Sequence, residues 1–300
     1  MKKTLAIALA LVCCLGLLAA CGEPASDPSE APASEAPASE APASEAPSSE
    51  PIELTGIVNT DGSTSMNDVM LALIEGFKSV QPGVTVNYNG SGSGSGISGV
   101  LAGSCDLGLS SRALTDDEKA EGAVENVIAK DGVAVVVNPA NPVTELTTEQ
   151  IAKIFTGEIT NWSEVGGEDA EIAVFGRDSA SGTRSAFEEI LGIEDQCAYL
   201  NEYSSTGDVI GNVASNPNAI GYASLSAVDE TVSAVSVDGV APTEATVADG
   251  SFPIQRPFVV VTVEGTELSP AAQAFLDYAM SDEVADIITA AGAVPASLAA

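Results

Sequence analysis

The sequence predicts an α/β fold with a largely parallel sheet, divided into two lobes with a hinge and a ligand cleft between them. Apolar runs typical of strands alternate from Ile52 onwards with segments whose apolar residues recur at helical spacing. Runs rich in serine, threonine and glycine follow several predicted strands, which is where parallel sheets bind ligands. About 250 residues remain after the N-terminal segments, which is enough for two lobes.

Residues 1–20 are predicted to be an export signal. Lys2 and Lys3 give it a positively charged start, and an uncharged apolar stretch follows over residues 5–18. The stretch ends in Leu-Ala-Ala-Cys, which resembles the lipobox of bacterial lipoproteins, so we expect cleavage before Cys21 and lipid attachment to its thiol. An ordinary signal followed by a chance cysteine is the alternative. The expected location is extracytoplasmic, with the lipid as the only membrane anchor.

Residues 21–51 are predicted to be a tether. The pattern Ser-Glu-Ala-Pro-Ala repeats from Ser29 onwards. The regular prolines block helix and sheet, and the regular glutamates keep the segment hydrated and extended. Folded structure is therefore expected from Ile52.

The first part of the folded chain is predicted to alternate between strands and helices. A helix is expected over residues 66–80, because Met66, Val69, Leu73 and Phe77 recur at helical spacing. The other elements expected here are strands at 53–58, 84–88 and 106–109 and a short helix at 97–102.

The second part continues this alternation. Residues 128–137 form a strongly apolar run, and Thr147 or Thr148 is expected to cap a helix that runs to Phe155. Phe187, Ile190 and Leu191 are expected to form the apolar face of a further helix. The remaining expected elements are strands at 172–175, 220–224 and 258–263 and helices at 208–214, 270–280 and 282–290.

This order predicts two lobes, the first of which is completed by the C-terminal segment. Lobe 1 comprises residues 52–137 and about 226–300, and lobe 2 comprises residues 138–225. Crossovers near Val137 and after Ser224 are expected to form the hinge.

The composition excludes several ligands and mechanisms. The formal net charge of −33 argues against nucleic acid or an anionic lipid surface as the ligand. The chain has no histidine, which excludes a Ser-His-Asp triad and a histidine-based zinc site; no metal or other cofactor is expected. Export permits a disulfide between Cys105 and Cys197, but their spacing does not support one, and two free thiols are expected.

Four runs of small residues suggest an anion site. They span residues 62–66, 92–97, 109–112 and 177–184. Glycines and small hydroxyl residues let backbone N–H groups approach a ligand, and a helix N-terminus adds partial positive charge. Each run alone is also explained as a turn, a flexible loop or a helix cap. Converging runs would hold an oxyanion with few basic side chains, which is the leading hypothesis for so acidic a chain.

In their joint order and spacing, the runs resemble those of the phosphate-binding lipoproteins of phosphate-specific ABC transporters, within the periplasmic binding-protein superfamily. The resemblance extends from Gly56 to the C-terminus and includes Ile-Phe-Thr-Gly-Glu-Ile-Thr-Asn-Trp at 154–162 and Ala-Ile-Gly-Tyr at 219–222. It implies the two-lobed periplasmic-binding-protein fold, capture of inorganic phosphate between the lobes and its delivery to an ABC permease. It also implies that the chain is not an enzyme, and a monomer is expected.

The resemblance implies which residues contact phosphate. Those from the first, second and fourth runs are small: Thr64, Ser65, Ser93, Ser181, Gly182 and Thr183. Arg177 matches the phosphate-pairing arginine of the family. The assignment suits the chemistry, because a guanidinium can bind two phosphate oxygens at once and hydroxyls donate to an oxyanion at little cost in volume.

The third run departs from the pattern of some family members. They carry an acidic residue where Ser111 stands, and it accepts the proton of the bound phosphate. Sulfate has no such proton at neutral pH, so this contact separates the two anions. Ser111 can still accept a hydrogen bond, and Asp178 or Asp61 is a candidate to replace the acid.

One charged position, Arg112, has two competing interpretations. Arg112 either adds a second cation near the cleft or pairs with Asp116 or Asp117 on the surface. Glu188 and Glu189 are assigned to a solvated helix face.

Other functions remain open. The first alternative is that the ligand is sulfate, molybdate or tungstate. An extracellular phosphoryl-transfer enzyme would use Ser63, Ser93 or Ser181 as its nucleophile, but the chain offers no histidine or suitably placed lysine to activate one. A sensor or adhesin that keeps the fold without a transport partner is a third possibility.

Overall fold

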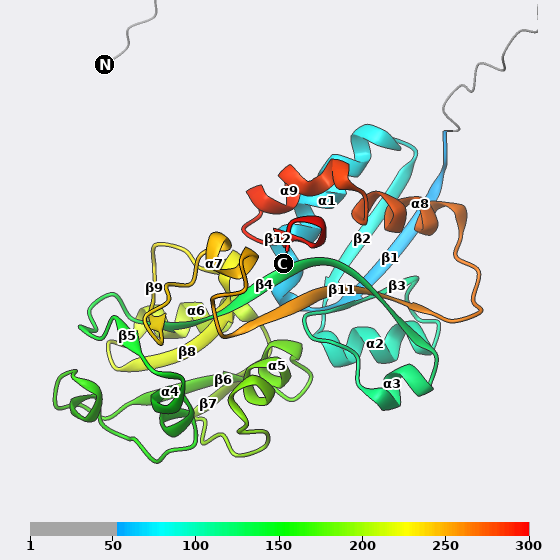
Figure 1. Cartoon of the computed structure of the whole chain (residues 1–300). Helices are drawn as coiled ribbons and strands as arrows, with labels where there is room; N and C mark the ends of the chain where they lie inside the picture. The colour runs from blue at the N-terminus through cyan, green and yellow to red at the C-terminus, as the bar shows by residue number, and fades with distance from the viewer. Residues whose placement is uncertain (1–52, 300) are drawn as a thin grey trace, which may run out of the picture. The chain divides into compact units, whose positions relative to one another are not determined.

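A computed structural model describes residues 53–299 of the chain (Figure 1). The predicted signal at 1–20, the acylation site Cys21 and the tether at 21–51 lie outside the described residues. No helix in the described part is long and apolar enough to cross a membrane.

The strands and helices follow in alternation. The strands are β1 (Gly56–Gly62), β2 (Val84–Gly90), β3 (Leu107–Ser110), β4 (Ala123–Val137), β5 (Glu145–Leu146), β6 (Ala173–Arg177), β7 (Asn201–Tyr203), β8 (Ala219–Ser224), β9 (Ser233–Ala234), β10 (Ser236–Val237), β11 (Gln255–Val263) and β12 (Val294–Pro295). The α-helices are α1 (Asn67–Val80), α2 (Ser93–Leu101), α3 (Asp116–Ala120), α4 (Thr148–Phe155), α5 (Gly182–Leu191), α6 (Thr206–Ser215), α7 (Glu244–Ala248), α8 (Pro270–Ala279) and α9 (Ala285–Ala290).

The main sheet joins two parallel groups of strands through two long antiparallel strands. Its order is β2-β1-β3-β11-β4-β8-β6-β7. β1 is parallel to β2 and β3, and β6 is parallel to β7 and β8. β11 runs antiparallel to β3 and β4, and β4 runs antiparallel to β8. The predicted parallel pairing is therefore present at both ends of the sheet, and the antiparallel centre was not predicted.

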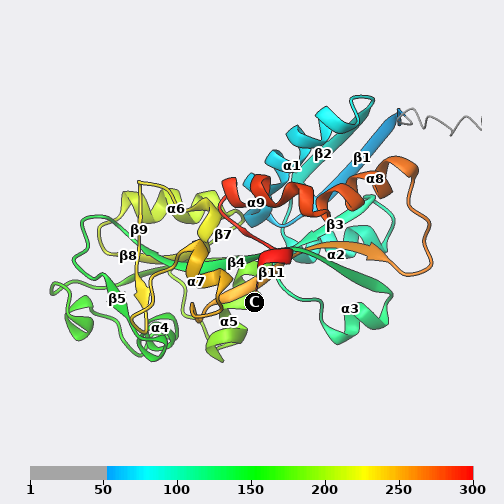
Figure 2. The ribbon, with the colours of Figure 1, turned by 45° about the horizontal axis from the view of Figure 1, so that its top comes forward.

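Two large apolar clusters lie along this sheet, one toward each end. The first includes Val58 of β1, Leu73 of α1 and Phe275 of α8. The second includes Phe155 of α4 and Phe187 of α5. Figures 1 and 2 show β4 and β11 passing side by side from one group of helices to the other.

The long strand β4 takes part in both clusters. Ile128 and Ala129 belong to the first cluster, and Val133 and the alternate residues after it belong to the second. Phe252 and Ile254 also pack in the second cluster, shortly before β11 begins. The lobe boundaries stay a prediction, and on this packing we propose that lobe 2 also takes in residues 233–254.

Most elements expected from the sequence are present, with shifted ends. The expected strand at 53–58 is β1, which runs to Gly62 because its residues pair in register with β2 and β3. Thr147 caps α4 as expected, since its side chain accepts a hydrogen bond from the N–H of Gln150. Ile190 of α5 is 38% exposed, so the expected apolar face is formed by Phe187, which is buried, and Leu191, which is partly buried against the second cluster.

Candidate functional site

Four helix starts from both ends of the sheet meet at one place. They are the 3₁₀ turn Thr64–Met66 that leads into α1 and the N-termini of α2, α5 and α6. The Ser65 hydroxyl lies 2.7 Å from the Thr183 hydroxyl and 3.0 Å from the Thr206 hydroxyl. The N–H of Gly94 donates to the carbonyl of Ala180 at 3.0 Å. Because each helix start carries unpaired N–H groups and partial positive charge, their convergence favours an anion.

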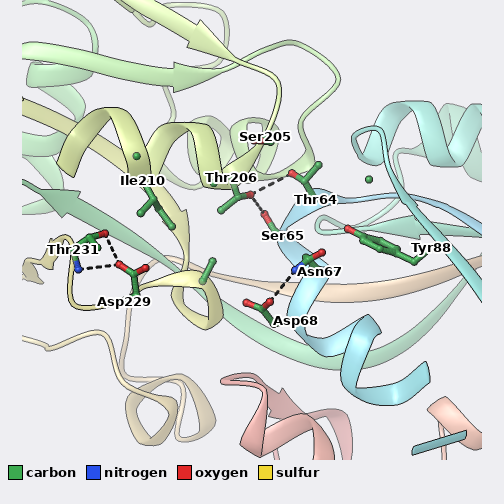
Figure 3. A pocket seen from close by; sticks show the side chains of 14 residues that line it. Thr64, Ser65, Asn67, Asp68, Tyr88, Ser205, Thr206, Ile210, Asp229 and Thr231 are labelled. Carbon is green, nitrogen blue, oxygen red and sulfur yellow. Dashed lines mark hydrogen bonds between the residues drawn. The ribbon is translucent and has the colours of Figure 1, made fainter. Parts of the chain in front are cut away.

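Hydroxyls from the two ends of the sheet face one another where these helix starts meet. We define the hydroxyl cluster as Thr64, Ser65, Thr183 and Thr206. The Thr64 hydroxyl lies 3.3 Å from that of Thr206, and Figure 3 shows Thr64 and Ser65 pointing toward Thr206. Ser65, Thr183 and Thr206 are all at most 3% exposed. A hydroxyl both donates and accepts, so these side chains can satisfy one another or turn toward a bound oxyanion.

A serine pair adjoins this cluster at the start of α5. The hydroxyls of Ser93 and Ser111 lie 3.2 Å apart, and the N–H of Ser111 donates to the Ser93 hydroxyl at 3.0 Å. A Cβ placed on Gly182 would lie 2.3 Å from the Ser93 hydroxyl oxygen and 3.1 Å from that of Ser111. Only a glycine therefore allows the start of α5 to approach the serine pair.

The approach of α2 to the other side of the site also requires glycine. Gly92 precedes α2 with φ of +104°, and a Cβ there would lie 2.9 Å from the carbonyl oxygen of Ala180. An L-residue would be strained in this conformation even with space for its side chain. The glycines of the second run thus bring two backbone segments into contact.

Arg177 places a buried cation beside the hydroxyl cluster. The residue is 1% exposed, and its Nη1 donates to the Thr206 hydroxyl at 3.0 Å. Nε donates to the carbonyl of Tyr203 at 3.1 Å, and Nη2 to the carbonyl of Ser204 at 2.8 Å. Burial lowers the pKa of Arg177, but a guanidinium stays protonated in proteins. These bonds use three of its five N–H groups and leave the fork able to bind an anion.

The backbone of Arg177 rests on a buried polar network. Its N–H donates to the Tyr222 hydroxyl at 3.0 Å, and the hydroxyls of Tyr222 and Tyr199 are 3.1 Å apart. Tyr199 donates to Glu188 at 2.9 Å, and Glu188 forms an ion pair of 2.8 Å with Arg184. Burial is the largest cause that raises the pKa of both tyrosines, so they stay neutral.

Glu188 corrects one expectation from the sequence. It is 4% exposed rather than on a solvated face. The reason is that Arg184, Tyr199 and the N–H of Asp195 all donate to its carboxylate. Burial of a charge is tolerated when it is paired and hydrogen-bonded in this way.

Two further predicted site residues, Ser181 and Arg112, differ in what they contact. Ser181 caps α5 by accepting from the N–H of Arg184 at 3.2 Å, directly before Gly182. Arg112 forms a two-pronged pair with Glu118, with distances of 2.8 and 2.7 Å, and also donates to the carbonyl of Ala113. Its partner is thus neither of the aspartates expected from the sequence, and its guanidinium is directed to α3.

The two aspartates considered as replacements for the acid have other partners. Asp61 accepts from the hydroxyl of Ser91 at 2.5 Å and from the side chain of Asn89 at 3.0 Å. Asp178 accepts from the N–H of Ala180 at 3.2 Å. Ser111, by contrast, lies in the serine pair beside Gly182, as described above.

Sequence reasoning missed Thr206 and Arg256. Thr206 belongs to a fifth run of small residues, Ser-Ser-Thr-Gly at 204–207, which has the same character as the other four and could have been found by the same criterion. Arg256 donates through Nη1 to the carbonyl of Ser111 at 3.1 Å. No local pattern around Arg256 indicates this contact, which joins residues far apart in the chain.

A cavity of about 610 Å³ opens beside the hydroxyl cluster (Figure 3). Thr64, Ser65 and Thr206 line it together with Tyr88, and Asp68 and Asp229 contribute carboxylates. The hydroxyl cluster is therefore reached from a groove between the start of α1 and the start of α6.

The two expected thiols are free. Cys105 and Cys197 form no disulfide and are half-buried. Burial raises the pKa of Cys105 to about 11 and that of Cys197 to about 12.

The chain is similar to known proteins over most of its length. A family model described as a PBP superfamily domain matches residues 31–283. The phosphate-binding protein PstS of Bacillus subtilis is 34% identical over 247 residues, covering 80% of this chain and 81% of the relative. The protein of the same name from Borreliella burgdorferi is 31% identical over 248 residues, covering 79% of this chain and 88% of the relative.

The chain belongs to the PstS family. A solved structure described as a phosphate ABC transporter substrate-binding protein from Clostridium perfringens, with bound phosphate, is 41% identical to it. It superposes with a TM-score of 0.77 and covers 80% of this chain and 99% of that one. The predicted PstS-type resemblance and the two-lobed periplasmic-binding-protein fold class are thereby confirmed.

Proposed function

We propose that this PstS-family protein captures inorganic phosphate at the hydroxyl cluster and delivers it to an ABC permease. The observation that carries the proposal is the meeting of four helix starts around buried hydroxyls and the Arg177 guanidinium. Such preorganised donors bind a dehydrated oxyanion without a basic surface, which fits a net charge of −33. The names of the relatives and the phosphate bound in the Clostridium structure support the same ligand.

Each part of the site has a role in this proposal. Arg177 pairs with phosphate oxygens through the remaining N–H groups of its fork. When phosphate binds, the hydroxyls of Thr64, Ser65 and Thr183 turn toward the anion instead of toward one another. The remaining donors are the hydroxyls of Ser93 and Ser181 and the N–H group of Gly182, while Ser111 accepts from a protonated phosphate oxygen. Arg112 acts at most from a distance, because Glu118 neutralises its charge.

A second tetrahedral oxyanion remains a candidate because of Ser111. A carboxylate at this position would repel an anion that has no proton to donate, such as sulfate. A hydroxyl donates as readily as it accepts, so it does not impose that penalty. Sulfate, molybdate and tungstate are therefore the competing ligands.

The function needs binding and release but no chemical step. The relatives are named for phosphate binding, and the chain is likewise a binding protein rather than an enzyme. Hinge bending about β4 and β11 would open and close the site, and the permease would contact both lobes. Export, acylation of Cys21 and display on the tether would keep the protein outside the cell membrane.

Isothermal titration of the purified protein, freed of phosphate, tests the ligand. We expect one-to-one binding of phosphate and weaker binding of sulfate, molybdate and tungstate. The R177Q variant should lose most of the affinity, whereas K78Q removes the same charge from an exposed surface pair and should bind normally. If another oxyanion binds more tightly than phosphate, that oxyanion is the ligand. If none of them binds, the proposal is overturned.

A further inference from the structure

A buried ion pair lies where the two long strands pass between the apolar clusters. Asp131 of β4 and Arg256 of β11 are directly paired in register. Nε and Nη2 of Arg256 lie 3.1 and 2.9 Å from Oδ2 of Asp131. The two side chains are 1% and 0% exposed. Since residues paired across strands on one face lie side by side, the sheet register itself brings these charges together.

Each member of the pair makes a further hydrogen bond, one toward the serine pair and the other toward β8. Nη1 of Arg256 donates to the carbonyl of Ser111 at 3.1 Å. On the other side, the Ser224 hydroxyl, at the end of β8, donates to Oδ1 of Asp131 at 2.8 Å and lies 2.7 Å from the Ser226 hydroxyl. A continuous chain of polar contacts thus runs from the serine pair across both crossing strands to β8.

The composition of this chain of contacts argues for a role beyond stability. A buried ion pair gains little over apolar residues of similar volume, because the cost of removing two charges from water offsets their attraction. What the pair supplies is geometry, since the planar guanidinium directs two N–H groups to Asp131 and a third to Ser111 at fixed angles.

Ser111 is the point at which this geometry reaches the site. Its N–H is bound by the Ser93 hydroxyl and its carbonyl by Arg256. Its own hydroxyl faces Ser93 and the start of α5 at Gly182. With both backbone groups held, the point from which the hydroxyl projects is fixed, and its staggered rotamers define the directions open to it.

We propose that Arg256, held by Asp131, is a positioning residue that orients Ser111 and thereby the serine pair toward the bound anion. The proposal rests on the function proposed above, and Arg256 itself does not touch the ligand. Its effect on affinity therefore passes through Ser111.

A double-mutant cycle on phosphate binding tests this role. Without Arg256, Ser111 should no longer direct its hydrogen bond to the charged anion. Losing such a bond corresponds to roughly a 10- to 100-fold loss in affinity, which is the loss that we expect for R256Q. S111A should also weaken binding. If Arg256 acts through Ser111, R256Q should cause less than about a 3-fold further loss in the S111A background. Losses that multiply independently, or an R256Q affinity equal to that of the wild type, would overturn the proposal.

Two further variants separate positioning from damage to the fold. K119Q removes one positive charge and a partly exposed ion pair with Glu125, and it should leave the affinity unchanged. D131N/R256Q replaces the pair by neutral polar groups, so no unpaired charge is buried. If R256Q does not fold, the cycle is measured with this double variant against S111A, and the same outcomes apply.

Titration of the wild-type protein distinguishes failure of the proposed function from failure of the positioning role. Absence of wild-type phosphate binding would overturn the proposed function and this inference with it. Normal wild-type binding, together with independent effects of Arg256 and Ser111, would overturn only the positioning role.

Discussion

The hydroxyl oxygen of Ser65 lies 2.7 Å from that of Thr183, although 118 positions separate the two residues. Ser65 precedes α1 and Thr183 lies in the first turn of α5, so this contact joins helix starts from the two ends of the sheet. Neither hydroxyl has a local reason to be buried. A ligand bound by both hydroxyls would explain why they meet. Substitutions of the surrounding residues test how this arrangement is maintained.

Arg177 should be required as a guanidinium and not only as a positive charge. R177K keeps the charge but cannot bind Tyr203, Thr206 and an anion through one planar fork. We expect an affinity for phosphate lower by about 10- to 100-fold, measured by isothermal titration. An affinity within about 3-fold of the wild type would show that charge alone suffices.

Gly182 should tolerate no side chain without loss of binding. In G182A the new Cβ would lie 2.3 Å from the Ser93 hydroxyl oxygen, so α5 or the serine pair must shift. We expect at least about a 10-fold loss in phosphate affinity. G211A is the matched control, because a Cβ there, also within a helix, meets nothing within 4 Å. Equal effects of the two substitutions would contradict the close approach of α5.

Removing the hydroxyl of Tyr222 should destabilise the protein. Y222F leaves the buried N–H of Arg177 without its acceptor, while the stacking on Phe187 at 4.3 Å is kept. We expect the free energy of unfolding to fall by about 1–3 kcal/mol in urea titrations. The control is Y278F, at a half-buried tyrosine on α8, and it should change stability less. A neutral Y222F would mean that Arg177 does not depend on this network.

Loss of Arg112 should affect phosphate binding little. Because Glu118 holds its guanidinium with two hydrogen bonds, R112A should change the affinity by less than about 3-fold and cost roughly 1 kcal/mol of stability. Titration and urea unfolding measure the two effects. A large loss of affinity with unchanged stability would instead make Arg112 the second cation of the cleft.

The thiol of Cys105 should react slowly at neutral pH. Its pKa of about 11 is raised by burial and by the carboxylates of Asp61 and Asp106. Because folding raises this pKa, the thiol's contribution to stability is complete below the ordinary thiol pKa of about 8.5 and is lost as the pH rises toward 11. Alkylation rates of the C197S variant, measured from pH 7 to 11, should rise steeply above pH 9. A rate already maximal at pH 8 would contradict the raised pKa.

Local patterns predicted several of the helices and one of their caps. The apolar spacing of residues 66–80 predicted α1, and the cap of α4, Thr147, was one of the two neighbouring threonines expected there. Helix periodicity and caps depend on residues a few positions apart, so they can be read directly from the chain. The first, second and fourth runs of small residues likewise lie at helix starts that meet in the structure.

The sequence by itself determined the alternation of strands and helices, the runs of small residues and the resemblance to the PstS family. Only the tertiary structure decided that Thr206 joins Ser65, that Arg112 pairs with Glu118, and that Arg256 reaches Ser111. These contacts depend on the register of β4 with β11 and on the meeting of the two ends of the sheet. No local pattern encodes such pairings, because a side chain's partner across strands or lobes is set by how the whole chain packs.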